Sequence, residues 1–78
     1  MNEEMSLCDL EPGRRGVVSG ISTAGAMRRR FLDIGLIENT GVECLGRGPG
    51  GDPSAYLIRG AVIAIRADDC RGIRVRAD

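Results

Sequence analysis

The chain has 78 residues, and its 11 arginines balance 11 acidic residues, so the net charge is zero. This balance removes the strong attraction to nucleic acid or anionic lipid that a basic domain would have. The absence of histidine removes the commonest general base and the commonest transition-metal ligand. No nucleophile–base pair is visible either. We therefore predict a non-enzymatic protein with no catalytic residues, no cofactor and no tight iron site of its own.

The cysteines and the N-terminus indicate where such a chain works. Cys8, Cys44 and Cys70 are odd in number and widely spaced, which argues against a disulfide framework and predicts buried structural thiols in a reducing compartment. Residues 1–6 are acidic and lack an apolar segment, so we expect a mobile tail and no signal peptide. No apolar run is long enough to enter a membrane directly. Residues 7–78 are then expected to form a single domain.

Residues 23–34 form the only stretch with a helical period. Its apolar face carries Ala24, Met27, Phe31 and Ile34. Gly35 follows directly and can take the left-handed conformation that ends a helix, while Ser22 or Thr23 can supply the N-cap oxygen. Because so short a helix is unstable alone in water, it must pack on the rest of the chain.

The rest of the chain is typical of short strands separated by turns. Apolar alternation predicts five strands, at residues 16–21, 41–46, 54–59, 61–66 and 72–76. Asn39 accepts a positive φ and predicts a turn before the second strand, and residues 67–70 suit a single 3₁₀ turn. Five strands with one helix after the first favour a mainly β fold, a strongly bent antiparallel barrel. An open α+β sheet is the alternative.

The predicted core combines the helical stripe with the inward positions of the strands. Its members are Val17, Ile21, Met27, Phe31, Ile34, Val42, Ile63, Ile65, Ile73 and Val75.

Two motifs suggest ligands, but their context argues against both. Residues 46–51 match the dinucleotide pattern G-x-G-x-x-G, yet they run into Pro53 and another strand instead of opening a helix. Asp52, Asp68 and Asp69 could offer oxygens to a hard cation, but their spacing fits no calcium loop. We interpret residues 47–53 as a surface loop and the three carboxylates as solvated turn acids.

The combination of short motifs along the chain resembles the FeoA-type domain of bacterial ferrous-iron transport. The resemblance covers about residues 7–76. It rests on Pro12-Gly13, Gly16-Val17-Val18, Arg30-Phe31-Leu32, Gly35-Leu36, Thr40, Val42, residues 49–53, Arg59-Gly60, residues 63–66 and residues 73–75. Two departures are Glu38-Asn39, where the family usually has Pro-Gly, and Gly50-Gly51 before Asp52, where a larger residue is commoner.

The resemblance implies a small SH3-like five-stranded antiparallel barrel with one α-helix between strands 1 and 2. It also implies a cytoplasmic accessory protein that binds the cytoplasmic side of the ferrous iron permease, a membrane protein with its own G-protein domain. That partner would recruit it to the inner membrane. The same domain also occurs in iron-dependent transcriptional repressors, so a regulatory interaction domain is the alternative, and a small nucleic-acid-binding barrel is another.

The expected contact surface is the outer side of the helix with the connector beside it. Arg28, Arg29 and Arg30 are the one charge cluster, and arginine suits an acidic partner through its planar donor fork. We expect the partner to contact Arg28, Arg29, Leu32 and Leu36. The competing interpretation is that Leu32 and Leu36 close the barrel while the arginines only keep the helix soluble.

Overall fold

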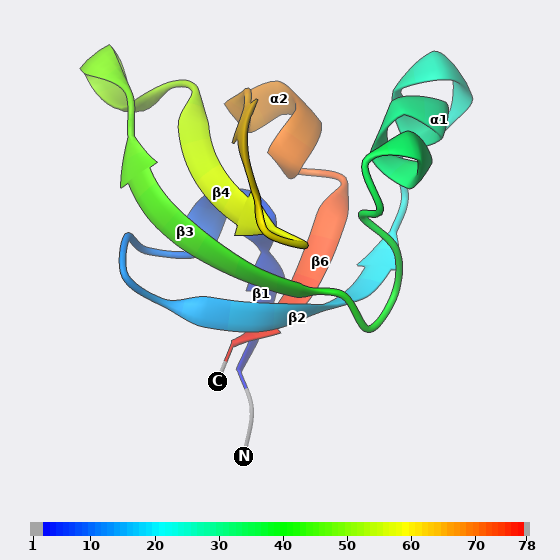
Figure 1. Cartoon of the computed structure of the whole chain (residues 1–78), viewed down its shortest axis with the longest axis horizontal. Coiled ribbons are helices and arrows are strands. Elements are labelled where there is room, and N and C mark those ends of the chain that lie inside the picture. Colours follow the sequence, from blue (N-terminus) through cyan, green and yellow to red (C-terminus); the bar gives the residue numbers. More distant parts are fainter. Residues whose placement is uncertain (1–2, 78) are drawn as a thin grey trace.

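The computed structural model describes residues 3–77, which form one bent antiparallel sheet with helices on one side of it (Figure 1). The sheet has six strands in the order β1-β6-β2-β3-β4-β5. The strands are β1 (Glu3–Ser6), β2 (Arg15–Ile21), β3 (Gly41–Arg47), β4 (Ser54–Ile58), β5 (Ala61–Ile65) and β6 (Ile73–Ala77). The helices are α1 (Gly25–Asp33) and α2 (Ala67–Cys70), and the 3₁₀ turns are η1 (Leu7–Asp9) and η2 (Pro49–Gly51). Neither helix in the described chain is long and apolar enough to cross a membrane.

The expected five-stranded closed barrel is wrong, because the sheet is open and has a sixth strand. Residues 3–6, expected in a mobile tail, are β1 and pair with β6. This strand has no apolar alternation, since Glu3 and Glu4 are exposed and form ion pairs with Arg14 at 3.3 Å and Arg74 at 3.5 Å. Residues 1 and 2 of the expected tail, and Asp78 of the expected domain, lie outside the described residues.

The open sheet follows from what comes after β5. The chain enters α2 before it reaches β6, and α2 packs against η1. As a result β5 pairs only with β4, and β1 pairs only with β6, so these two strands are the edges of the sheet. The expected 3₁₀ turn at residues 67–70 is one turn of α-helix instead.

The core lies in the hollow of the bent sheet and centres on Tyr56, whose hydroxyl donates to the carbonyl of Leu7 at 3.3 Å. The predicted core residues that are buried are Phe31, Val42, Ile65, Ile73 and Val75. Those only partly buried against the core are Ile21, Met27, Ile34 and Ile63. Cys44 and Cys70 are buried, as predicted for structural thiols. The further buried apolar residues, outside the predicted core, are Leu7, Leu10, Val18, Leu36, Tyr56, Ile58 and Ala77.

The prediction that Val17 belongs to the core is wrong. Gly16 and Val18 point inward and are buried, whereas Val17 is half-buried on the outer side. Two adjacent valines fit either register of a period-2 pattern, and only the pairing of β2 with β3 and β6 selects one.

The cysteines and the turn acid Asp52 differ in detail from the prediction, Cys8 in its burial and Asp52 in having a hydrogen-bond partner. All three thiols are free, with Cys44 and Cys70 buried and Cys8 half-buried. Asp52 is exposed, but its carboxylate accepts a 2.9 Å hydrogen bond from the Ala67 N–H. That bond satisfies a donor at the start of α2, so this acid anchors a helix end as well as facing solvent.

Candidate functional site

Helix α1 begins two residues later than predicted, because the chain before it is bound elsewhere. The Ser22 N–H and hydroxyl both donate to the carbonyl of Gly72, at 2.7 and 3.2 Å. The backbone stays extended through Ala24, which is exposed, so the predicted Ser22 or Thr23 cap is absent and Ala24 is not on the buried stripe. The first helical residue is Gly25.

The C-terminus of α1 is built as predicted around Gly35. This residue has φ +85°, and its N–H donates to the Leu32 carbonyl at 3.0 Å. The Leu36 N–H donates to the Phe31 carbonyl at 2.8 Å, and both side chains are buried. These two bonds and this apolar contact make a Schellman motif, which holds the helix end rigidly against the core.

A cross-connection that the sequence did not reveal ties this helix end to the β4–β5 turn. The Arg59 guanidinium donates through Nε to the Gly35 carbonyl at 3.0 Å, and the Thr40 hydroxyl donates to the same oxygen at 3.1 Å. A cation at the negative end of a helix dipole is favourable. Asn39, with φ +71°, forms the predicted turn that returns the chain to β3. The helix is therefore held in a fixed position beside the β4–β5 hairpin.

The structure separates the four predicted contact residues into two groups. Arg28, Arg29 and Leu32 are exposed, Leu32 to 47%. Leu36 is fully buried, so its assignment to the contact surface is wrong. Leu36 follows Gly35, whose left-handed conformation turns the chain back toward the core.

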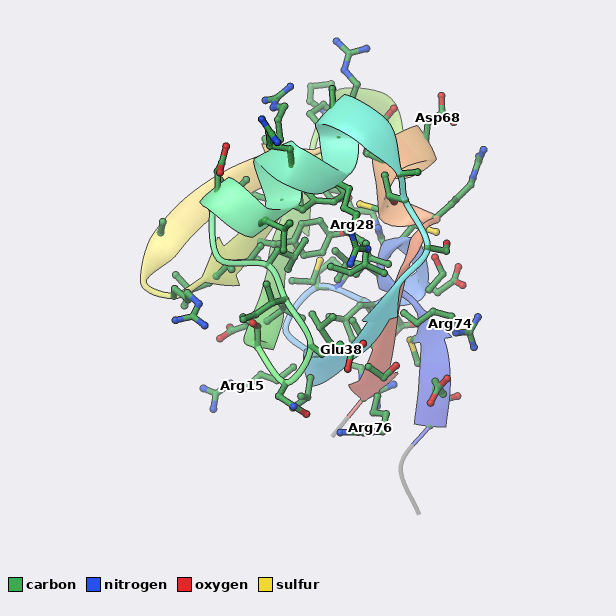
Figure 2. All side chains as sticks on the ribbon, turned by 90° about the vertical axis from the view of Figure 1, so that its right-hand side faces the viewer. Arg15, Arg28, Glu38, Asp68, Arg74 and Arg76 are labelled. Atoms are coloured by element: carbon green, nitrogen blue, oxygen red, sulfur yellow. The ribbon has the colours of Figure 1, made fainter. Side chains whose placement is uncertain are left out.

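Arg28 is exposed without projecting freely from the helix. Its Nη1 donates to the Ile21 carbonyl at 3.1 Å, and Figure 2 shows the side chain reaching from α1 toward the end of β2. Arg29 and Leu32 have no such contact to the sheet among the hydrogen bonds of residues 3–77 and remain on the outer side. We call Arg28, Arg29 and Leu32 the outer α1 surface.

A groove that sequence reasoning missed runs between α1 and β5. Its volume is about 190 Å³. Residues from three elements line it, namely Met27, Arg30, Phe31, Ile34, Ile63, Ala64, Ile65, Arg66 and Asp69. The apolar stripe of α1 is covered only in part, because Met27 and Ile34 are each half-buried, and Ile63 across the groove on β5 is half-buried as well. No local pattern could show this, since the two walls are about 30 residues apart in the sequence.

A second hollow of about 340 Å³ lies over β2, β3 and the β4–β5 turn. Gly16, Gly41 and Gly60 leave it open, and Arg15 at its rim forms a 3.4 Å ion pair with Glu43. It is shallow, and the one further titratable side chain that lines it, Arg59, donates to the Gly35 carbonyl. Over the described residues, no cluster of three or more histidine, cysteine or acidic side chains could hold a metal ion.

The titratable groups with altered pKa values lie in the core. Burial raises the pKa of the Cys70 thiol from 9.0 to about 11, and burial raises the pKa of Tyr56 above its ordinary 10.0. The thiol donates to the Tyr56 hydroxyl across 3.6 Å. Both groups stay protonated at neutral pH, so this buried pair packs the core and supplies no nucleophile.

Both the sequence and the fold of the chain are similar to those of known proteins. The family model of the FeoA domain matches residues 5–77. A FeoA protein from Chlorobium tepidum is 32% identical, with a TM-score of 0.87 over 92% of this chain and 69% of that one. No curated protein sequence matches the chain.

Two more distant structures show the fold alone. A zinc complex of FeoA from Stenotrophomonas maltophilia, an SH3-domain protein, is 24% identical, with a TM-score of 0.81 over 91% of this chain and 88% of that one. A manganese-dependent transcriptional repressor is 23% identical, with a TM-score of 0.86. The match covers all of this chain and 44% of the repressor.

Proposed function

This chain belongs to the FeoA domain family, and on that premise we propose that it is a non-enzymatic accessory protein of bacterial ferrous-iron uptake. It works in the cytoplasm, where it binds the cytoplasmic side of the ferrous iron permease and its G-protein domain, and this partner recruits it to the inner membrane. Iron is the cargo of the permease. The description of the S. maltophilia relative, which connects that protein with activation of ferrous iron transport, supports the proposal.

The observation that carries this proposal is the outer α1 surface. It presents the exposed Leu32 beside the arginines of a helix whose end is fixed by a Schellman motif and by Arg59. A rigid apolar and arginine patch loses little conformational entropy on binding, and such anchors tend to dominate interface energies. An acidic, partly apolar patch on the permease would complement it.

Charge reversal on this surface tests the proposal. In a strain that lacks its own copy of the gene, Arg29→Glu combined with Leu32→Glu should abolish permease-dependent uptake of labelled ferrous iron while the variant stays folded. Arg28→Glu with Arg29→Glu should do the same, although the first change also removes the hydrogen bond to Ile21. The matched control is Arg76→Glu, an exposed charge reversal on β6, which lies away from α1 in Figure 2. If the folded double variants support full uptake, this surface is not the contact.

A second candidate function follows from the structural likeness to the manganese-dependent repressor. Here the chain would act as a regulatory interaction domain beside a DNA-binding unit. The two candidates differ in what gene deletion changes. Loss of a permease accessory protein lowers uptake at constant permease abundance, whereas loss of a regulatory domain changes transcript levels of metal-uptake genes. A small nucleic-acid-binding barrel would instead show salt-sensitive binding to DNA or RNA.

A further inference from the structure

The two edges of the sheet are protected very differently. On β1, the exposed Glu3 and Glu4 place charges along the edge, a common protection against pairing with another chain. On β5 no residue is charged, and the exposed side chains belong to Ala61, Val62 and Ala64, with Val62 67% exposed. An exposed apolar edge strand is a liability for a soluble domain unless a partner covers it.

The backbone of β5 has hydrogen-bonding groups available along this edge. The two-residue turn at Arg59 and Gly60 pairs Ile58 with Ala61, and the register continues through Ile63 and Ile65. In such a hairpin the two residues that flank the turn are a hydrogen-bonded pair. The backbone N–H and C=O groups of Ala61, Ile63 and Ile65 therefore point toward β4. The N–H and C=O groups of Val62 and Ala64 therefore point away from β4, and within residues 3–77 no backbone group of another element bonds to them.

The groove between α1 and β5 adjoins this edge and has a defined chemistry. Ala64 lines it, its floor is Phe31 with Ile63 and Ile65, and its volume of about 190 Å³ suits one large apolar side chain. Arg30 and Arg66 stand on its rim with Asp69. Among the described residues neither guanidinium has a hydrogen-bond or ion-pair partner, so the rim offers two cations against one anion.

We propose that β5 and this groove bind an extended segment of another protein, which adds to the sheet as a further strand beside β5. The segment bonds to the outward backbone groups of Val62 and Ala64. It places one large apolar side chain in the groove and a neighbouring Asp or Glu against Arg30 and Arg66. Strand addition gives affinity through the main chain, and the pocket and the charges give specificity. This binding mode goes beyond the function proposed above and holds whichever protein supplies the segment.

Charge complementarity favours a different protein over a second copy of this chain. If β5 of one copy paired with β5 of another, neither strand would supply an acidic side chain, because residues 61–65 are all uncharged. The arginines of both grooves would then lack partners. A segment of another protein that carries its own carboxylate can bond to the outward backbone groups of β5 and also pair with the arginines at the rim of the groove.

The probe is a phage-displayed library of linear peptides about twelve residues long, which is enough to span β5. It is selected on the immobilised full chain, and the most enriched sequence is synthesised and titrated into isotope-labelled protein. Enriched peptides should carry a large apolar residue next to Asp or Glu. On binding, hydrogen exchange of the Val62 and Ala64 amides should slow about tenfold or more, whereas the amides of β1 should not change.

Ala64 offers a matched pair of variants. Ala64→Pro removes one outward N–H without touching the β4 ladder, since proline is tolerated on an edge strand, and it should weaken peptide binding about tenfold. Ala64→Ser keeps the N–H and should bind within about twofold of the original chain. If Ala64→Pro does not fold, Arg30→Glu with Arg66→Glu is the second test, and it should weaken the acidic peptide about tenfold while favouring peptides with lysine in its place.

Three outcomes would overturn the proposal. One is that no peptide is enriched above the bare support. Another is that the bound peptide protects amides outside β5, or binds a folded Ala64→Pro variant as tightly as the original chain. The last is that sedimentation shows a dimer that Ala64→Pro abolishes, since the edge would then be occupied by a second copy.

Discussion

Neighbouring strands β4 and β5 have similar compositions and opposite surroundings. β4 reads Ser-Ala-Tyr-Leu-Ile and alternates between fully and partly buried positions, whereas β5 reads Ala-Val-Ile-Ala-Ile and is exposed over most of its length. The difference lies in the neighbours, because β4 lies between β3 and β5 while β5 has a strand on one side only. Apolar content predicts that a segment is a strand, but the position of the strand in the sheet decides whether it is covered.

The largest expected effect of a single change lies in β4. Tyr56 is fully buried at the centre of the core, and Tyr56→Ala should cost about 3–5 kcal/mol of unfolding free energy, enough to unfold so small a domain. Urea denaturation followed by circular dichroism measures this. A variant that still unfolds cooperatively near the original midpoint would mean that the core is centred elsewhere.

The turn that joins the two strands should give the next effect. Gly60 has φ +81°, and a Cβ there would meet no atom within 4 Å, so Gly60→Ala isolates backbone strain and should cost about 1–2 kcal/mol. Gly41→Ala is the matched control: it also has open space, but its φ is ordinary, so its stability should change by about 0.5 kcal/mol or less. Equal effects in the two variants would contradict the strain argument.

Alkaline pH should destabilise the fold through Tyr56 of β4 and Cys70, which contacts it, whereas β5 carries no titratable side chain. The pKa of Cys70 rises from 9.0 to about 11 on folding and that of Tyr56 rises above 10.0, so the folded state holds protons that the unfolded chain releases. Stability is therefore full below pH 9 and falls as the pH rises through 9 to 11. Unfolding free energies measured across this range check the slope, and a flat profile would contradict it.

Tyr56→Phe distinguishes the contribution of the Tyr56 hydroxyl to the loss of stability at alkaline pH from that of the Cys70 thiol. It removes the hydroxyl that bonds to Leu7 and should cost about 1 kcal/mol at neutral pH. The alkaline loss should then become smaller, because the raised pKa of Tyr56 no longer contributes to it and that of Cys70 still does. A variant with an unchanged pH profile would assign the whole effect to other groups.

The smallest expected effect lies in β5. Val62 is 67% exposed, so Val62→Ala should change the free energy of unfolding by about 0.5 kcal/mol or less, although it removes an apolar side chain from a strand. Thermal unfolding of the isolated protein measures this. A loss as large as that expected in β4 would mean that the isolated chain covers β5 by association with itself.

Part of the structure could be predicted from the sequence because it depends on neighbours in the chain. The apolar period placed α1, Gly35 placed its end, Asn39 placed the turn after it, and alternation placed Ile73 and Val75 inside. Each of these features is determined within about one turn of helix or a few residues of strand. The exposure of Arg29 on the outer side of α1 follows from the same helical period.

Only the tertiary structure decided the rest, since it depends on which segments become neighbours in space. The acidic residues 3–6 carry no strand pattern and form β1 because β6 offers an edge. Leu32, at the edge of the apolar stripe, is exposed and Leu36 is buried, an outcome that depends on how the helix end packs on the core and is tied to the distant Arg59. The uncovered edge of β5 and the groove beside it exist because α2 leads the chain away before the sheet can close. A short-range sequence pattern shows which side chains are apolar, and tertiary packing decides which of them are buried.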